Sequence, residues 1–166
     1  PVPAPGGPDL NSGVTRNDNV KAYVKIDRRR NEIIGYNPDH MSYNISPAMP
    51  NFRGYFIVQF DQPIDSVGVW HNTERFADLT ELHSNKRLGA YVSFKESGKE
   101  QTVKVKIATS FISLEQAREN LKKEIPSWNL QALTKDVKNK WQDNLSRIKI
   151  DGVTEDQRTI FYTAMY

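Results

Sequence analysis

The chain of 166 residues contains no cysteine. This absence excludes disulfide bonds, thiolate catalysis and cysteine-ligated zinc. No apolar run approaches the roughly 20 residues that a membrane-spanning helix needs. The net charge is only +3, from 23 Lys and Arg against 20 Asp and Glu, and so small a basic excess does not indicate nucleic-acid binding. A hydrophobic fraction of 37% is that of an ordinary globular domain.

The common signatures of catalysis are also missing. The sequence has no glycine-rich phosphate loop, no nucleophile elbow and no His-Glu-x-x-His motif. The three histidines, at positions 40, 71 and 83, lack the spacing of metal ligands. Carboxylate pairs are the usual acid and base of sugar hydrolysis, and the candidates here are Asp61 with Asp65, Glu74 with Asp78, and Glu155 with Asp156. All three pairs fall in turns or at a helix start, which favours structural roles.

The first two thirds of the chain have the pattern of β-structure. Residues 1–19 are rich in Pro, Gly, Asn and Asp and predict a flexible lead-in. Residues 20–112 contain six or seven apolar runs of period 2, separated by short turns, which predicts an antiparallel β-sandwich. We expect residues 71–87 to form a polar loop. In the last run, the alternation predicts Val105 and Ile107 inside and Lys106 outside.

From Phe111 onward the hydrophobic period changes from 2 to 3.6. Ser113 with Gln116, and Thr154 with Gln157, have the spacing of capping boxes, and Asn129 is a candidate N-cap between them. The last helix is apolar on one face and continues to the final residue. We therefore expect the chain to be part of a longer protein, with this face covered by the remaining polypeptide.

One strand end has the composition of a ligand contact. Trp70, His71 and Asn72 follow a predicted strand and combine aromatic and polar groups, as binding rims do. We predict that these three residues contact a substrate. The other aromatic residues of the β-region could form an exposed platform for sugars, although alternating aromatics in strands more often belong to the core. We assign no catalytic and no metal-binding residue within this chain.

Several segments resemble the family-92 glycoside hydrolases, the bacterial exo-α-mannosidases. The resemblance is strongest from Leu88-Gly-Ala-Tyr-Val-Ser-Phe-Lys onward and covers roughly residues 20–166. The remaining segments that carry it, in chain order, are Gly54–Ile64, Val103–Asn129, Trp141–Ile148 and Thr154–Tyr166.

The resemblance implies a fold and a reaction. The fold is of the α+β class: a partial, galactose-mutarotase-like supersandwich, then linker helices that lead to an (α/α)6 barrel. The implied reaction is the calcium-dependent, inverting release of terminal α-linked mannose, α-1,2-linked in the first instance, from glycans. The implied location is the periplasm, cell surface or exterior of a bacterium. The family's catalytic carboxylates and calcium ligands come from the barrel, so no residue here inherits these roles.

The resemblance also suggests a division of the chain. Residues 1–19 form the lead-in, 20–112 the partial sandwich, 113–152 the helical linker and 153–166 the start of a barrel that is cut short. We expect the chain alone to be inactive and to bind no calcium. Its expected partners are mannose-containing glycans and the rest of the polypeptide, with no nucleic acid.

Two other interpretations remain open. The chain could be a self-standing carbohydrate-binding β-module with a helical tail, for which an exposed Tyr or Trp platform would be the discriminating feature. It could also be an interaction domain without a ligand, in which case the apolar face of the last helix would bind a protein partner. The two capped helices followed by a third favour the glycosidase interpretation.

Overall fold

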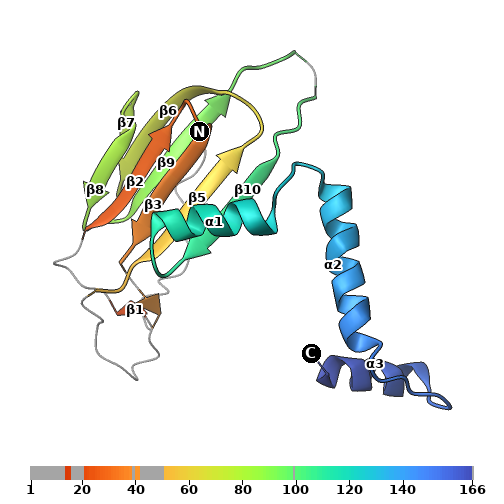
Figure 1. The fold of residues 1–166 in the computed structure, drawn as a ribbon. Coiled ribbons are helices and arrows are strands. Elements are labelled where there is room, and N and C mark those ends of the chain that lie inside the picture. Colours follow the sequence, from red (N-terminus) through yellow and green to blue (C-terminus); the bar gives the residue numbers. More distant parts are fainter. Residues whose placement is uncertain (1–13, 16–20, 39, 42–50, 99, 166) are drawn as a thin grey trace. The chain divides into compact units, whose positions relative to one another are not determined.

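The computed structural model describes residues 14–15, 21–38, 40–41, 51–98 and 100–165. The predicted lead-in, apart from residues 14–15, lies outside the described residues. The chain divides into two compact units, residues 1–126 and 127–166, and each is described by itself. Figure 1 shows that the first unit holds the sheets and helix α1, and that the second holds helices α2 and α3.

Two antiparallel sheets form the body of the first unit. The strands of the five-stranded sheet lie in the order β10-β5-β3-β2-β8, and those of the three-stranded sheet in the order β7-β6-β9. The bounds are β2 Ala22–Asp27, β3 Glu32–Asn37, β5 Gly54–Phe60, β6 Ile64–His71, β7 Glu74–Ala77, β8 Glu81–Ser84, β9 Leu88–Phe94 and β10 Val105–Ser110. A further pair joins β1, Val14–Thr15, to β4, His40–Met41.

The core lies between the two sheets. Val24 and Ile26 of β2 pack against Ile64, Val67 and Val69 of β6, and all five are at most 8% exposed. This arrangement follows from the period-2 alternation, which places every second side chain of each strand on the shared face. The predicted antiparallel sandwich is confirmed.

The β2–β3 hairpin shows how a charged run becomes a turn. The carboxylate of Asp27 accepts hydrogen bonds from the backbone N–H groups of Arg29 (2.9 Å) and Arg30 (3.1 Å). Asn31 then adopts a φ of 50°, a left-handed conformation that Asn tolerates better than most residues.

Helix α1, Leu114–Glu124, covers the outer face of the five-stranded sheet. Its Ala117 and Leu121 pack on Ile57 of β5, and all three side chains are at most 6% exposed. The hydroxyl of Ser113 caps the helix by accepting a hydrogen bond from the Gln116 N–H at 3.0 Å. The reciprocal half of the predicted capping box is not made, because the Gln116 side chain donates to Asn120 instead.

A buried ion pair fixes this helix on the sheet. Glu32 is only 1% exposed, and its two carboxylate oxygens accept parallel hydrogen bonds from Arg118 of α1, both at 2.8 Å. A buried carboxylate is costly unless its charge and its lone pairs are matched, and the bidentate guanidinium does both. Arg30 lies 4.0 Å from the same carboxylate and is a weaker partner.

Two predictions about the strands are wrong. Residues 71–87 contain the short strands β7 and β8, because each pairs along one neighbouring strand despite its polar sequence. In β10 the side chains point as predicted, with Val105 paired to the inward-facing Phe60, but the burial is the reverse of the prediction. Lys106 is 8% exposed and donates to the carbonyl of Ile125 at 2.9 Å, whereas Val105 and Ile107 are 49% and 58% exposed. The aliphatic stem of Lys106 lies under α1, and its ammonium group binds the end of that helix. A cation therefore occupies a position that an apolar side chain normally takes. Removal from water lowers the pKa of Lys106.

The second unit consists of α2, Leu130–Leu145, and α3, Glu155–Ala164. The predicted caps are confirmed: Asn129 accepts from the Ala132 N–H at 3.0 Å, and Thr154 and Gln157 form a complete capping box. The Tyr162 hydroxyl donates to the carbonyl of Ile148 at 3.1 Å. Within the described part of the chain, no helix is long and apolar enough to cross a membrane.

Replacing Arg118 with Ala should destabilise the first unit. The substitution strands the Glu32 carboxylate, and we expect the free energy of unfolding to fall by about 2–3 kcal/mol, less than a fully buried pair would lose because Arg30 remains nearby. Urea denaturation followed by circular dichroism measures this loss. The control is Lys140→Ala, which breaks the exposed pair with Asp136 and should cost less than about 0.5 kcal/mol. Equal effects of the two substitutions would contradict the assignment.

Candidate functional site

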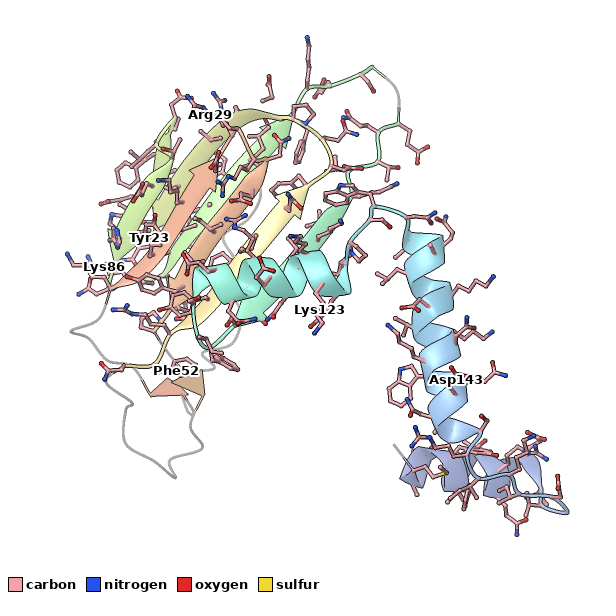
Figure 2. The ribbon with its side chains drawn as sticks, in the orientation of Figure 1. Tyr23, Arg29, Phe52, Lys86, Lys123 and Asp143 are labelled. Carbon is pink, nitrogen blue, oxygen red and sulfur yellow. The ribbon has the colours of Figure 1, made fainter. Side chains whose placement is uncertain are left out.

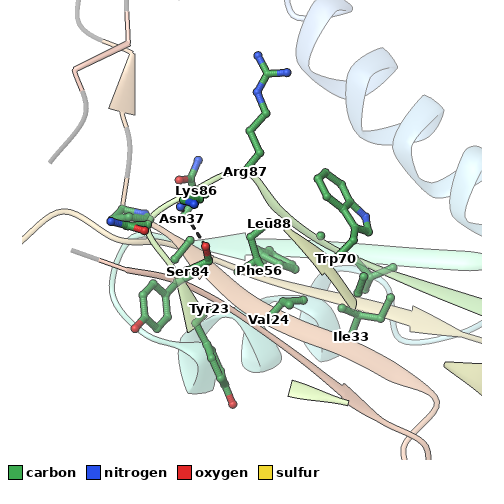
Figure 3. A pocket seen from close by; sticks show the side chains of 17 residues that line it. Tyr23, Val24, Ile33, Asn37, Phe56, Trp70, Ser84, Lys86, Arg87 and Leu88 are labelled. Carbon is green, nitrogen blue, oxygen red and sulfur yellow. Dashed lines mark hydrogen bonds between the residues drawn. The ribbon is translucent and has the colours of Figure 1, made fainter. Parts of the chain in front are cut away.

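The three residues predicted to contact a substrate lie where β6 ends, but not on one face. Successive side chains of a strand point to opposite faces, and Val67 and Val69 point into the core. His71 therefore shares the inner face, and Trp70 lies on the outer face. In Figure 3 the Trp70 side chain points away from Val24 and Ile33. A single sugar ring can reach at most one of these two side chains.

His71 is held by its neighbours. Its Nε2 lies 3.0 Å from a carboxylate oxygen of Glu74, and its ring stacks on Phe76 with the centroids 5.5 Å apart. The other ring nitrogen, Nδ1, is buried without a hydrogen-bond partner among the described residues. These contacts order the turn between β6 and β7.

Asn72 forms that turn. It has a φ of 50°, and its backbone N–H donates to the carbonyl of Arg87 at 2.9 Å. Its side chain is exposed. The backbone bond joins the β6–β7 turn to the start of β9, so the rim predicted from the sequence is a rigid corner of the three-stranded sheet.

A cleft of about 530 Å³ opens at this end of the sandwich. Its floor consists of inward-facing residues of both sheets, including Val24, Phe56 and Leu88, and Trp70 borders it. Lys86 and Arg87 contribute positive charge, and in Figure 3 the Arg87 side chain extends away from the other labelled residues. The loop that carries them is ordered by the Lys86 N–H, which donates to the Ser84 hydroxyl at 3.0 Å.

Tyrosines crowd the same end of the molecule. Tyr23, Tyr36 and Tyr55 lie at paired positions on three adjacent strands, with ring centroids 5.6 and 5.8 Å apart. His83 stacks on Tyr23 at 4.5 Å, and the Arg53 guanidinium lies 4.9 Å from the centre of the Tyr36 ring. Figure 2 shows Tyr23 and Lys86 at the end of the sandwich opposite Arg29.

Burial and the neighbouring Glu81 shift the ionisation of one of these tyrosines. Loss of water contact, and then the hydrogen bond and negative charge of Glu81 at 3.1 Å, raise the pKa of Tyr23 to about 12. Lys25 lies 3.3 Å from Glu81 and completes a chain of polar contacts. The hydrogen bonds from Lys25 and Tyr23 keep the pKa of Glu81 low, against the opposing effect of desolvation.

The carboxylate pairs have structural partners. Asp61 accepts from the Lys104 N–H at 2.8 Å, Glu74 binds His71, and Glu155 begins α3. Among the residues that the structure describes, no three His, Asp or Glu side chains lie close enough together to hold a metal ion.

The tyrosine row and the contribution of residues 84–87 were not predicted from the sequence. The signal for the tyrosines was present in the alternation, since Tyr23, Tyr36 and Tyr55 all occupy outward positions of predicted strands. The signal for residues 84–87 was hidden, because they fall within residues 71–87, which the polar composition predicted to be one loop.

Comparison with known proteins places the chain in a family. Residues 8–110 match the N-terminal domain model of glycosyl hydrolase family 92, and residues 116–166 match the catalytic domain model of the same family. The chain belongs to glycoside hydrolase family 92.

The relatives of this family-92 chain are much longer than the chain itself. It is 32% identical over 85 residues to an uncharacterized secreted glycosidase of Arthroderma benhamiae. The aligned region covers 48% of this chain and 11% of that protein. A family-92 inverting mannosidase from Bacteroides thetaiotaomicron is 25% identical, with a TM-score of 0.72, over 88% of this chain and 19% of that one. A second family-92 glycosyl hydrolase, ccman5, is 21% identical and matches in fold, with a TM-score of 0.69 over 94% of this chain and 20% of its own.

The Tyr23 phenol should ionise late. A phenolate titration by ultraviolet absorbance should show that Tyr23→Phe removes a group with a pKa of about 12, against the ordinary 10.0. Because the unfolded chain loses this proton first, the stabilising effect of Tyr23 is complete below pH 10 and disappears as the pH rises through about 12. Tyr91→Phe is the matched control. If Tyr23→Phe removed a phenol with an ordinary pKa, the assignment would be contradicted.

Proposed function

We propose that this chain is part of an α-mannosidase that releases terminal α-linked mannose from glycans by inverting hydrolysis. The observation that carries the proposal is the order of the two family matches, an N-terminal domain followed directly by the start of a catalytic domain. The similarity to an inverting mannosidase in both sheets and helices supports mannose as the substrate.

In the proposed enzyme, the residues of this chain have a structural role. The sandwich and α1 form one packed unit, and the second unit begins directly after it, within the segment that matches the catalytic domain. We propose that the first unit holds the catalytic domain in place and borders the substrate site. The acid and base then come from the rest of the catalytic domain, where a water molecule fits between two carboxyl groups.

The predicted glycan contacts Trp70, His71 and Asn72 remain part of the proposal. Trp70 offers an aromatic ring and Asn72 an exposed amide, both suited to sugars, which combine apolar C–H faces with hydroxyl groups. His71 is already bound to Glu74 and stacked on Phe76, so its proposed contribution is to hold Asn72 in position.

We assign calcium to the larger protein. Calcium takes six to eight oxygen ligands, often several carboxylates among them, and the described residues gather no cluster of three His, Asp or Glu side chains. No step of the reaction is therefore assigned to the metal here. A secreted location is supported by one homologue that is named as a secreted glycosidase.

The 166-residue chain alone should release no mannose from α-mannosides, with or without calcium. The reason is that both proposed catalytic carboxyl groups lie in the rest of the catalytic domain. Chromatographic detection of free mannose after incubation with α-1,2-mannobiose measures this. Turnover that survives repurification would show that the reacting groups are in this chain and that the proposed division is wrong.

A longer protein that contains this chain and a complete catalytic domain should lose mannosidase activity in a calcium chelator and regain it when calcium is restored. Magnesium serves as the control, since it demands a smaller, octahedral site and should not restore activity. Full activity in the chelator would remove calcium from the proposal and leave the family assignment intact.

A further inference from the structure

We propose that Trp70 and Tyr91 form a flat glycan-binding platform on the outer face of the three-stranded sheet. The ligand is a mannose-containing oligosaccharide, a choice that rests on the proposed function. The platform itself rests on the geometry of β6 and β9.

The sequence contains two Gly-x-aromatic triplets that pair with each other. Gly68 precedes Trp70 by two residues in β6, and Gly89 precedes Tyr91 by two residues in β9. The antiparallel register places Gly68 opposite Tyr91 and Trp70 opposite Gly89. Each aromatic side chain therefore faces a position without a side chain on the neighbouring strand.

The rings use that space. A Cβ added to Gly89 would lie 2.4, 2.5 and 2.6 Å from three neighbouring atoms of the Trp70 indole. The indole therefore occupies the space above Gly89 that a side chain would otherwise fill. A Cβ added to Gly68 would lie 2.1 Å from Cζ of Tyr91. Both rings thus lie against the backbone, where any other residue would lift them.

The other side of the platform is accessible in the described residues. Leu88, Ala90 and Val92 point into the core, so Gly89 and Tyr91 belong to the outer face. Tyr91 is 38% exposed. The helix of this unit, α1, packs on the other sheet, as Figure 1 shows.

Hydrogen-bonding groups surround the rings. Ser66 and Ser93 lie on the same face with their hydroxyl oxygens 2.6 Å apart, and the Tyr91 hydroxyl extends over Gly68. Arg75 of β7 occupies the position paired with Trp70. Aromatic faces for C–H groups, with hydroxyls and a guanidinium at the edge for sugar hydroxyls, are the complement of a pyranose ring.

This composition favours a sugar over a protein segment. A protein-binding face would present aliphatic side chains around its aromatics, whereas here the outward positions beside the two rings are Gly, Ser, Arg and Ala77. Acidic residues are absent from those paired positions, so the face also does not select a basic peptide.

The test is a titration of the 166-residue chain with α-1,2-mannobiose and with yeast mannan, followed by calorimetry and by tryptophan fluorescence. We expect binding that Trp70→Ala and Tyr91→Ala each weaken about tenfold or more, the scale of an aromatic stacking contact. Trp70→Phe should retain part of the affinity. The control is Phe111→Ala, which removes a 77% exposed aromatic residue outside this face and should leave the affinity unchanged.

A second pair of variants tests the geometry without removing either ring. Gly89→Ala forces the Trp70 indole off the sheet and should weaken binding as Trp70→Ala does. Gly54→Ala is its match, because a Cβ there meets its nearest neighbour at an ordinary 3.7 Å and should change nothing. Circular dichroism reports whether each variant is folded.

Two results would overturn the platform: no binding of either saccharide at millimolar concentration, or unchanged binding in the folded Trp70, Tyr91 and Gly89 variants. A pull-down in which this face binds a polypeptide, and in which added saccharide does not compete with that binding, would also overturn it. Failure of the proposed function is separate. Mannan binding that these variants abolish, in a family-92 protein without mannosidase activity, would remove the reaction and keep the platform.

Discussion

The arrangement of the first unit depends on one buried carboxylate. Glu32 lies on the outer face of the five-stranded sheet, where burial is tolerable only with the bidentate Arg118 of α1 as its partner. The apolar contact of Ala117 and Leu121 with Ile57 provides area but little direction, because hydrophobic packing is not directional. The ion pair supplies the direction. It fixes α1, in which the segment that matches the catalytic domain begins, against the five-stranded sheet.

Most of the fold could be predicted from local pattern. The alternation of Val24 and Ile26 identified an inward face without any knowledge of the partner sheet, and the caps at Asn129 and Thr154 gave helix starts that the structure confirms. Capping depends on residues three positions apart, so a sequence carries nearly all the information it requires. The family assignment, made from ordered segments across both halves, is likewise confirmed.

The errors occurred where a distant partner decides the outcome. Burial of Lys106 is possible because the carbonyl of Ile125 accepts a hydrogen bond from its ammonium group, a contact between residues 19 positions apart in the chain. Strands β7 and β8 exist because neighbouring strands pair with them, although their own residues are polar. The pairing of aromatic residues across strands depends on distant partners in the same way. Sequence proximity grouped Trp70 with His71, whereas strand geometry groups Trp70 with Tyr91, which is 21 residues later.

The edge strand β10 has a consequence for the chemistry of this chain in solution. It is the outermost strand of its sheet, and it exposes Val105 and Ile107 on one face while no described strand pairs with its outer edge. A strand edge next to exposed β-branched side chains is a template for strand addition. Concentrated samples should therefore associate through β10, and a charged substitution at position 107 is the simplest way to keep the chain monomeric.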